Sequence, residues 1–313
     1  MKKILSSLIA ICALFTLVAC GSINKSETTK TSKNTMTTFH ALNGDVKVPK
    51  DPKRVVVQNY PDEVSSLGVN VVGTDSWAYP NPFLSKSQKE NMVDLGAPSF
   101  NLEKLIAQKP DLIITVDKDQ VADYQKIAPT VLVNYQDLSG ITTSLDYFAK
   151  LLNRENEKKE FLANFKKVAK KQMTKLEESG ITPSDKTVSI LELQGSKIYA
   201  FGDNFARGGQ ALTTGLGFKQ STKMAELSKG TGYAEVNAES LNNFDADYIF
   251  IDFASADKAQ YEALQKNPVW QNLKAVKAGH VIVMDYNQVY FFGGPTATQK
   301  ELSLYTNAIL NNK

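Results

Sequence analysis

Residues 101–114 read NLEKLIAQKPDLII, and residues 237–250 read NAESLNNFDADYIF. In both stretches an asparagine precedes a short helical pattern with an early glutamate, and an aspartate then leads into an apolar strand. Three matched positions share one offset: 237 − 101 = 136, 239 − 103 = 136 and 247 − 111 = 136. Asparagine and an early acidic residue are common at helix starts, so one copy would carry little information. Two copies in register predict two related lobes.

Short apolar runs recur around these stretches and alternate with helical segments. Each run is continuous and largely β-branched, as expected for strands covered on both faces in an α/β sheet. We therefore predict an α/β protein with two Rossmann-like lobes whose sheets are mainly parallel. The predicted strands are 54–57, 69–73, 111–115 and 130–133 in the first half, and 188–193, 248–253 and 280–284 in the second.

A helical segment separates the two halves. Residues 144–179 contain neither proline nor glycine, and Leu145, Phe148 and Leu152 recur at helical spacing. The pattern predicts a single long helix between the lobes, with a break near 153–156. Because one helix allows only limited rotation between the parts it joins, a fairly stiff clamp is expected.

The N-terminus has the features of a signal peptide. Met1-Lys2-Lys3 precedes an apolar run from Ile4 to Ala19, which is shorter than the roughly 20 residues that span a bilayer. The run ends in Leu17-Val18-Ala19-Cys20, which resembles the lipobox of bacterial lipoproteins, whose cysteine carries acyl chains that anchor the protein. We predict lipidation of Cys20 on the extracellular face of the cell membrane. An ordinary secretory peptide with an incidental Cys20 is the alternative.

The composition places the domain boundaries. Residues 1–19 form the predicted signal peptide, and the polar residues 20–38 form the lipidated cysteine and a flexible tether. Cys12 and Cys20 are the only cysteines, so the mature protein has no disulfide. The remaining boundaries are an N-terminal lobe at 39–142, a connecting helix at 143–180 and a C-terminal lobe at 181–313.

Charge and motifs exclude several classes of protein. Removal of Lys2 and Lys3 lowers the formal net charge from +3 to 3 − 2 = +1, which does not favour nucleic-acid binding. The mean hydropathy of −0.27 argues against a polytopic membrane protein. There is no nucleophile elbow, phosphate loop or dinucleotide fingerprint. We predict a protein without enzymatic activity or cofactor; a lipid-anchored extracellular enzyme is the alternative.

Histidine is too scarce for a zinc-like centre. His40 and His280 are the only histidines in the chain. His280 stands at the start of a strand, where a hydrogen bond to the backbone is expected. The sequence thus predicts no direct metal site.

Aromatic residues follow several predicted strands, which is where α/β folds place ligands. Packing in the core explains any one of them equally well, but their shared position in loops favours a binding site. Trp270 has apolar neighbours at helical spacing and is predicted to lie in the core. The candidate binding residues of the first lobe are Tyr60, Trp77, Tyr79 and Tyr135.

Arg207 is one of three arginines and follows Tyr199 and Phe205 in a turn-rich segment. A planar, permanently charged guanidinium flanked by rings suits a ligand with delocalised oxygens and apolar bulk. The alternative is a structural arginine that binds loop carbonyls. The other two, Arg54 and Arg154, are expected at the surface.

Several motifs resemble the iron-siderophore substrate-binding lipoproteins of bacterial ABC importers, and the similarity covers nearly all of the mature chain. Residues 199–209 and 232–236 are similar to the hydroxamate branch of that family, which takes ferrichrome and ferrioxamine. The other motifs that carry the resemblance are VPKDPKRVV at 48–56, KPDLI at 109–113, IAPT at 127–130 and WQNLKAV at 270–276.

The resemblance implies an iron(III)-siderophore complex held in a cleft between the lobes, with the siderophore and not the protein ligating iron. By matching position, three residues of the second lobe would line that cleft: Tyr199, Phe205 and Arg207. Phe291 would join them from a late loop. Tyr233, in the similar segment 232–236, is a further candidate binding residue. Several relatives have tryptophan where Phe205 and Phe291 stand, which puts the rank order of ligands in question.

The family also implies that acidic side chains dock onto arginines of the permease. Glu103 and Glu239, at equivalent places in the two repeats, are the matching positions. First-turn acids that favour the helix dipole are the alternative explanation, with a contribution of about 0.3–1 kcal/mol each.

A ferric tris-hydroxamate is neutral, so its recognition needs aromatic surface and a few donors, whereas a triscatecholate is strongly anionic and should need several converging cations. The residues favour a monomeric receptor that binds ferric hydroxamate siderophore and delivers it to an ABC permease with its ATPase. A catecholate siderophore, haem or cobalamin receptor on the same scaffold is the alternative.

Overall fold

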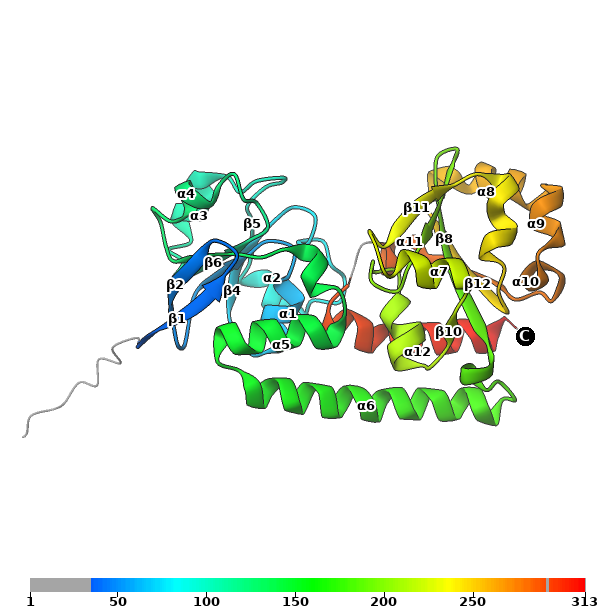
Figure 1. Ribbon diagram of the computed structural model, residues 1–313, viewed down its shortest axis with the longest axis horizontal. Coiled ribbons are helices and arrows are strands. Elements are labelled where there is room, and N and C mark those ends of the chain that lie inside the picture. Colours follow the sequence, from blue (N-terminus) through cyan, green and yellow to red (C-terminus); the bar gives the residue numbers. More distant parts are fainter. Residues whose placement is uncertain (1–34, 291–292, 313) are drawn as a thin grey trace, which may run out of the picture. The chain divides into compact units, whose positions relative to one another are not determined.

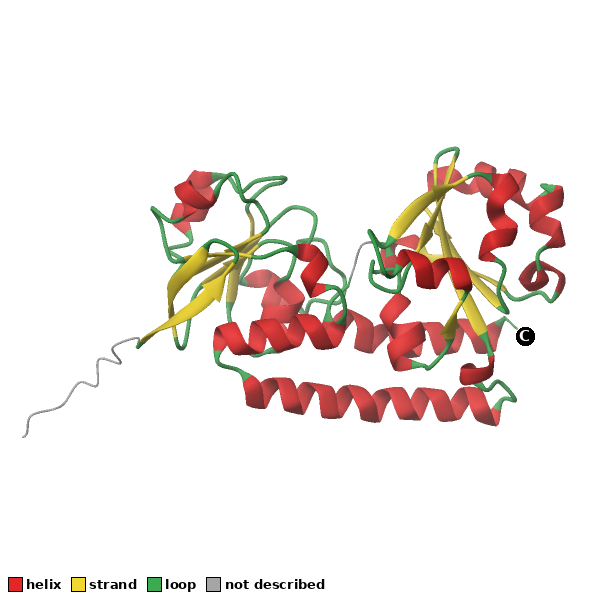
Figure 2. Ribbon diagram, viewed as in Figure 1, coloured by secondary structure: helices red, strands yellow, loops and turns green. Residues whose placement is uncertain are grey.

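The computed structural model describes residues 35–290 and 293–312, whose strands form three sheets (Figures 1 and 2). The predicted signal peptide, Cys20 and residues 20–34 lie outside the described residues. No helix in the described part of the chain combines the length and apolarity that crossing a bilayer requires.

The first sheet is an antiparallel hairpin of β1 (Met36–Ala41) and β2 (Gly44–Pro49). Its turn uses the left-handed backbone of Gly44, at φ 94°. Phe39 and Val48 bury one face of the hairpin. Residues 36–38 are therefore part of a strand, and their assignment to the tether is wrong, because their alternating pattern pairs with β2.

The sheet of the first lobe is parallel throughout, with the order β5-β4-β3-β6-β7. Val55 and Val57 pack on one face and Val56 on the other, each fully buried. Burial of both faces explains the continuous apolar runs, and all four predicted strands are present. The strands are β3 (Val55–Val57), β4 (Val71–Thr74), β5 (Val93–Asp94), β6 (Leu112–Thr115) and β7 (Thr130–Leu132).

Short helices connect these strands. They are α1 (Pro61–Ser66), α2 (Lys86–Glu90), α3 (Leu102–Ala107), α4 (Val121–Tyr124) and the 3₁₀-helix η1 (Tyr135–Leu138).

The sheet of the second lobe is mixed, with the order β11-β9-β8-β12-β13 and β10 beside β8. β12 runs parallel to β8 and β13, whereas β9 is antiparallel to both β8 and β11. The two lobes are thus related in their parallel strands, and an antiparallel edge distinguishes the second. The strands are β8 (Thr187–Gln194), β9 (Lys197–Phe201), β10 (Lys219–Gln220), β11 (Tyr233–Val236), β12 (Tyr248–Phe253) and β13 (Val281–Asp285).

The helices of the second lobe are also short, with one exception, α12. They are α7 (Thr222–Leu227), α8 (Lys258–Gln265), α9 (Pro268–Asn272), α10 (Lys274–Lys277), α11 (Tyr286–Val289) and α12 (Pro295–Asn311), with single turns η2 (Pro183–Asp185), η3 (Ala211–Gly215) and η5 (Ser255–Asp257) and the longer η4 (Ala238–Phe244).

The repeated stretches begin their helices in the same way. The Asn101 side chain accepts a hydrogen bond from the Lys104 N–H at 3.0 Å at the start of α3. The Asn237 side chain accepts one from the Ser240 N–H at 2.9 Å at the start of η4. Both asparagines are N-caps, as the repeat predicts.

The repeated aspartates are equivalent too. Asp111 precedes β6 and accepts the backbone N–H of Arg54, beside β3, at 3.0 Å. Asp247 precedes β12 and accepts the backbone N–H of Thr187, the first residue of β8, at 2.8 Å. Each aspartate fixes the start of the neighbouring parallel strand, which explains why the offset is maintained through both stretches.

Two helices occupy the segment between the lobes: α5 (Ile141–Leu152) and α6 (Glu155–Glu178). The predicted break is confirmed, because Asn153 takes the left-handed conformation, with φ 57°, that ends α5. α6 then runs alongside α5 and α12 (Figure 1). One apolar cluster includes strand residues from both sheets together with α5, α6 and α12. This shared core supports the expectation of limited rotation.

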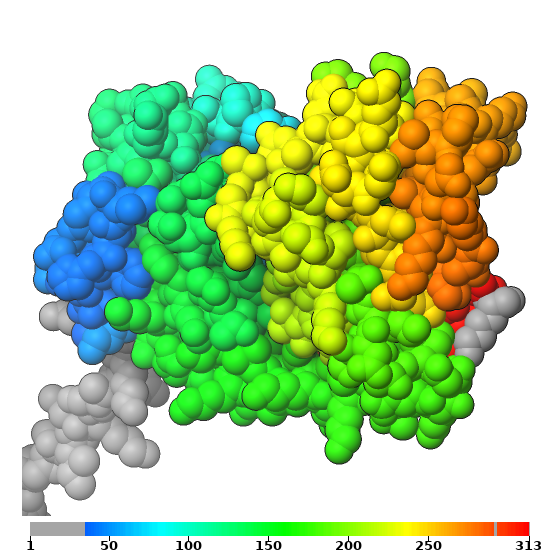
Figure 3. Space-filling view, turned by 45° about the vertical axis from the view of Figure 1, so that its right-hand side comes forward, coloured from blue at the N-terminus to red at the C-terminus, as the bar shows by residue number. Residues whose placement is uncertain are grey.

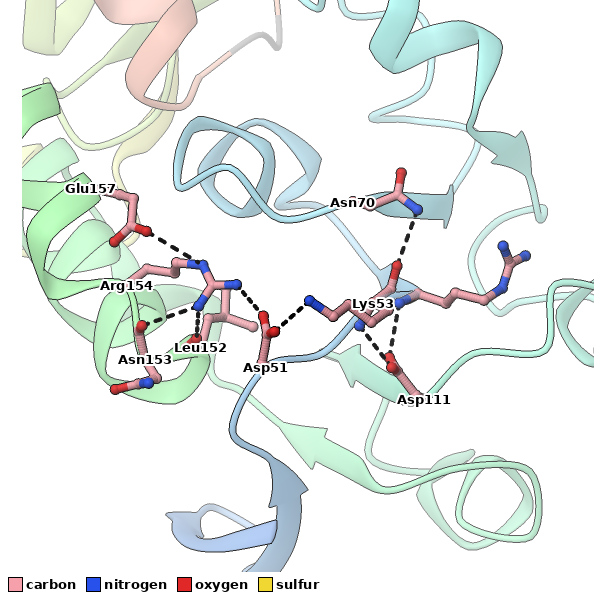
Figure 4. Close-up of polar contacts among 9 residues, drawn as sticks. Asp51, Lys53, Asn70, Asp111, Leu152, Asn153, Arg154 and Glu157 are labelled. Carbon is pink, nitrogen blue, oxygen red and sulfur yellow. Dashed lines mark hydrogen bonds and ion pairs between the residues drawn. The ribbon is translucent and has the colours of Figure 1, made fainter. Parts of the chain in front are cut away.

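Arg154 attaches the break between α5 and α6 to the first lobe (Figure 4). Its guanidinium contacts a carboxylate oxygen of Asp51 at 2.5 Å and one of Glu157 at 3.7 Å. Asp51 also pairs with Lys53, whose carbonyl accepts the side-chain N–H of Asn70 at 3.1 Å. The segment between β2 and β3 is therefore held against the start of α6.

Two predictions about single side chains are confirmed. Trp270 is 2% exposed and lies in the apolar cluster on one face of the second sheet. His280 Nδ1 lies 3.0 Å from the carbonyl oxygen of Asp247, and its ring stacks on Tyr248 at 4.5 Å. Both side chains have structural roles in the second lobe.

Candidate ligand-binding site

A pocket lies between the two lobes and is lined by segments of both. From the first lobe come residues 59–63 and several residues of 135–144; from the second come most of 203–210 and residues at the start of α12. The pocket contains about 1070 Å³ free of protein atoms, including open solvent at its mouth. Figure 3 shows a face on which the first lobe, blue to green, meets the yellow residues of the second.

The pocket is lined by loops that follow the carboxyl ends of strands. Residues 59–63 follow β3, and residues 203–210 follow β9. Asn59 turns the chain in the left-handed conformation, at φ 67°, and its N–H donates to Asp75 Oδ2 at 2.6 Å. Gly208, at φ 69°, packs so closely on Tyr305 that a Cβ there would lie 2.0 Å from its ring. These close contacts fix both loops.

Three of the predicted binding residues line the pocket: Tyr60, Tyr135 and Phe205. Tyr60 is 9% exposed and its ring packs on Phe148, with centroids 5.3 Å apart. Tyr135 is 49% exposed, and Phe205 is half-buried. The pocket therefore has an aromatic contribution from each lobe.

The other predicted residues lie outside the lining. Trp77 is 51% exposed, beside the lining residue Ala78. Tyr233 packs on Phe205 from β11, with ring centroids 5.0 Å apart. Tyr79 and Tyr199 are partly buried against the core, and Phe291 lies outside the described residues. Their roles in ligand binding stay predictions.

Arg207 is buried below the pocket wall, with its side chain 3% exposed. Its Nε donates to Glu192 Oε2 at 2.7 Å, and its guanidinium lies 4.1 Å from the centroid of Phe201 and 5.6 Å from that of Phe205. The hydroxyl of Tyr305 donates to the Arg207 carbonyl at 2.6 Å. The Arg207 side chain thus packs against the rings of Phe201 and Phe205, which we call the aromatic wall. Its role toward a ligand stays a prediction.

Asp252 completes a group that we call the paired cluster: Glu192, Arg207 and Asp252. The register of β8 and β12 sets Asp252 beside Glu192, and both are buried. Burial and the charge of Glu192 raise the pKa of Asp252 to about 8, and Arg207 opposes that rise. The sequence contained a signal for this cluster, since Glu192 and Asp252 interrupt apolar strand runs.

A second group, the acidic cluster, consists of Asp62, Glu63 and Glu301 and lines the pocket. Asp62, from α1, accepts the N–H groups of Thr296 and Ala297 at 2.9 and 3.0 Å, at the start of α12. Asp62 therefore caps a helix whose own N-cap is a glycine, Gly294. These acids were not predicted as site residues, because Asp62 and Glu63 have an ordinary explanation as first-turn acids of a helix and Glu301 lies within a long helix.

All three acids of this cluster are buried. Burial raises the pKa of Asp62, although the two N–H donors oppose it. Burial, and then the charge of Asp62, raise the pKa of Glu63 to about 8. The same two causes raise the pKa of Glu301 well above its usual value. The described residues include no group of three or more His, Cys, Asp or Glu side chains that could hold a metal ion.

Glu103 and Glu239, the predicted docking residues, are exposed in the first turns of α3 and η4. Neither lines the pocket. Their position leaves them available to a partner.

Comparison with known proteins identifies the family. Residues 62–287 match the periplasmic binding proteins. The chain belongs to this family. Membership confirms the prediction of a binding protein without enzymatic activity, since the periplasmic binding proteins bind solutes and are not enzymes.

Individual members of the periplasmic binding proteins match the chain along its length. The iron(3+)-hydroxamate-binding protein FhuD of Bacillus subtilis is 35% identical over 98% of both chains. The iron(3+)-hydroxamate-binding protein YxeB of the same organism is 31% identical over 99% of this chain and 98% of its own. The structure of FhuD2 from Staphylococcus aureus with bound ferrioxamine B is 25% identical, with a TM-score of 0.69, over 83% of this chain and 99% of that one. The two-lobe fold with its long helix is thus that of a known binding protein.

Proposed function

We propose that this chain is the substrate-binding protein of a bacterial ABC importer for iron, and that it binds a ferric hydroxamate siderophore in the pocket between the lobes. The siderophore ligates the iron, and the protein needs no cofactor. The names of FhuD and YxeB and the ferrioxamine B bound to FhuD2 support this class of ligand.

The charge of the pocket carries the proposal. Its described lining contains no lysine, arginine or histidine, but it includes four acids: Asp62, Glu63, Asp203 and Glu301. A strongly anionic ligand such as a triscatecholate or ferric citrate would find no opposite charge in this described lining. A neutral or cationic ferric hydroxamate would instead meet the rings of Tyr60, Tyr135 and Phe205, which offer apolar surface and hydroxyl groups.

The remaining predicted residues belong to the proposal in different ways. A ligand that extends beyond the described pocket lining would contact the predicted residues outside it: Trp77, Tyr79, Tyr199, Tyr233 and Phe291. Arg207 would reach the iron-bound oxygens only if its guanidinium moved away from Glu192, since both side chains are buried. In its described position it holds the aromatic wall.

Delivery depends on the parts outside the pocket. We propose that lipid on Cys20 anchors the protein to the extracellular face of the cell membrane and that the monomer docks on the permease, with its ATPase, through Glu103 and Glu239. The double variant Glu103→Ala and Glu239→Ala should keep its affinity for ligand and lose iron uptake in cells. Normal uptake would remove both residues from the docking surface.

A fluorescence titration tests ligand binding directly. Ferric ferrioxamine B and ferrichrome should cause saturable quenching, whereas ferric citrate, a ferric triscatecholate, haem and cobalamin should not. Trp77 is exposed and Trp270 is buried, so most of the quenching should disappear in Trp77→Phe if the ligand lies near this loop. Saturable binding of the anionic ligands, and none of the hydroxamates, would overturn the proposed function.

A further inference from the structure

We propose that Asp62, Glu63 and Glu301 form a cation subsite in the pocket, which accepts a protonated amine carried by the ligand. The inference rests on the proposed function and narrows it to hydroxamate siderophores that have a free amino group.

Two carboxylate oxygens in this cluster have no hydrogen-bond partner. Asp62 uses Oδ2 to cap α12, whereas its Oδ1 is buried without a partner. Oε1 of Glu301 is also buried without a partner. Both residues are 1% exposed and both line the pocket. Because buried polar atoms are nearly always hydrogen-bonded, such a pair indicates donors that a ligand supplies.

No cation of the described chain lies in the pocket lining. Lys300 is the one cation whose charge lowers the pKa of Asp62, but its ammonium group donates to the carbonyl of Phe83 at 2.7 Å, at an exposed site. Glu63 adds a third acid on the same side. A positive charge bound among the three acids would stabilise their ionised forms and reverse the effect of burial.

The chemistry favours an ammonium group over a metal ion. An ammonium has three N–H donors and no acceptor, which matches a set of carboxylate oxygens that lack donors. The absence of a metal-holding group among the described residues agrees with this choice. Among ferric hydroxamates, ferrioxamine B is a linear chain that ends in a primary amine, whereas its N-acetylated derivative has the same iron-binding part without the charge.

These two complexes provide a matched pair of probes. Affinity should be measured by fluorescence titration at pH 7 and constant ionic strength, with no divalent cation added. The unaltered protein should bind ferric ferrioxamine B at least tenfold more tightly than its N-acetylated derivative. This ratio should fall toward one in Glu63→Gln and in Glu301→Gln, because each removes an acid and keeps the shape of the side chain.

The control is Glu178→Gln, which removes the same charge at an exposed position at the end of α6. It should keep the full ratio. Unchanged affinity for the N-acetylated complex shows that a variant is folded, so lost discrimination then belongs to the acid itself. If a variant binds neither complex, a competition experiment on the unaltered protein takes its place, with butylammonium or calcium added during titration of ferric ferrioxamine B. Competition by butylammonium supports the subsite, and competition by calcium alone overturns it.

Equal, tight binding of both complexes to the unaltered protein would overturn the cation subsite and leave the proposed function intact. A ratio that persists in both glutamine variants would do the same. Binding of neither complex would overturn the proposed function, and the subsite with it.

Discussion

The two buried charge clusters of this protein differ in one respect, which is whether the chain provides the opposite charge. In the paired cluster, the Nε of Arg207 lies 2.7 Å from Glu192 of β8, and the charge of Arg207 opposes the rise in the pKa of Asp252 of β12. In the acidic cluster, α1 and α12 bring together Asp62, Glu63 and Glu301, and the described pocket lining offers no cation.

The difference indicates that buried charges can stabilise the fold at one place and remain available for ligand binding at another. Buried charges are tolerated when they are paired, and removal of one partner leaves a costly charge behind. In the paired cluster the chain itself supplies a cation, Arg207, so this cluster serves the structure. The acidic cluster has no such cation in the described pocket lining. Its burial instead raises the pKa values of Glu63 and Glu301, which line the pocket.

Arg207→Ala should have the largest effect on this comparison. It turns the paired cluster into a second unpaired acidic cluster, and we expect the free energy of unfolding to fall by about 3–5 kcal/mol. Urea denaturation followed by circular dichroism measures the loss. Arg54→Ala is the matched control, since Arg54 is exposed and donates to the carbonyl of Gln108.

Two results separate the roles of Arg207. A large loss of stability, with ligand affinity recovered at low temperature, assigns the guanidinium to the paired cluster. Unchanged stability with a loss of ferric hydroxamate affinity would show that Arg207 acts on the ligand, as the resemblance implies.

The second prediction concerns pH and the acidic cluster. The pKa of Glu63 rises to about 8 in the folded protein from an ordinary value of 4.5, so the folded state holds the proton more tightly than the unfolded chain. Stability is then fully present below the unfolded pKa and is lost as the pH rises toward 8. Asp252, whose pKa is also raised to about 8, adds to the same trend.

Glu63→Gln separates the two contributions. Glutamine does not ionise, so the variant should match the unaltered protein near pH 5 and exceed its stability at pH 8, by on the order of 2–4 kcal/mol. Urea denaturation across this range measures the difference, with Glu178→Gln as the exposed control. Parallel curves for the two proteins would mean that Glu63 does not titrate in this window.

The elements that could be predicted from sequence are those with a local cause. β12 is an apolar run interrupted only by Asp252, and it has its predicted bounds, Tyr248–Phe253. Asn153 ends α5 because asparagine tolerates the left-handed conformation. The 136-residue offset predicted paired caps because an N-cap depends on neighbours three residues away.

The site was harder to predict, because its contacts are distant along the chain. Glu192 and Arg207 are 15 residues apart, and Asp62 and Ala297 are 235 apart. Arginine between aromatic residues is compatible with a ligand contact or with a buried ion pair, and the acid inside the strand Thr187–Gln194 was the signal that favours the pair. Asp62 offered no such signal, since its partner is a helix terminus that only the fold brings near.

Asp62→Ala should have the smallest effect on stability of the three substitutions. It removes the acceptor for the first N–H groups of α12, at a cost of about 1–2 kcal/mol, and it also removes a buried acid that repels Glu63 and Glu301. The two effects oppose each other, so the net loss should lie near the lower end of this range. Thermal denaturation at pH 7 measures it.

Asp62→Asn distinguishes the two effects, because asparagine keeps an acceptor of the same shape for Thr296 and Ala297 and has no charge. If the cap matters most, the asparagine variant should be more stable than the alanine variant by about 1 kcal/mol. If instead both variants lost the same stability, the carboxylate charge would be the stabilising feature of Asp62. The helix terminus of α12 would then be the missing partner of the acidic cluster, and the two clusters would differ less than their side chains suggest.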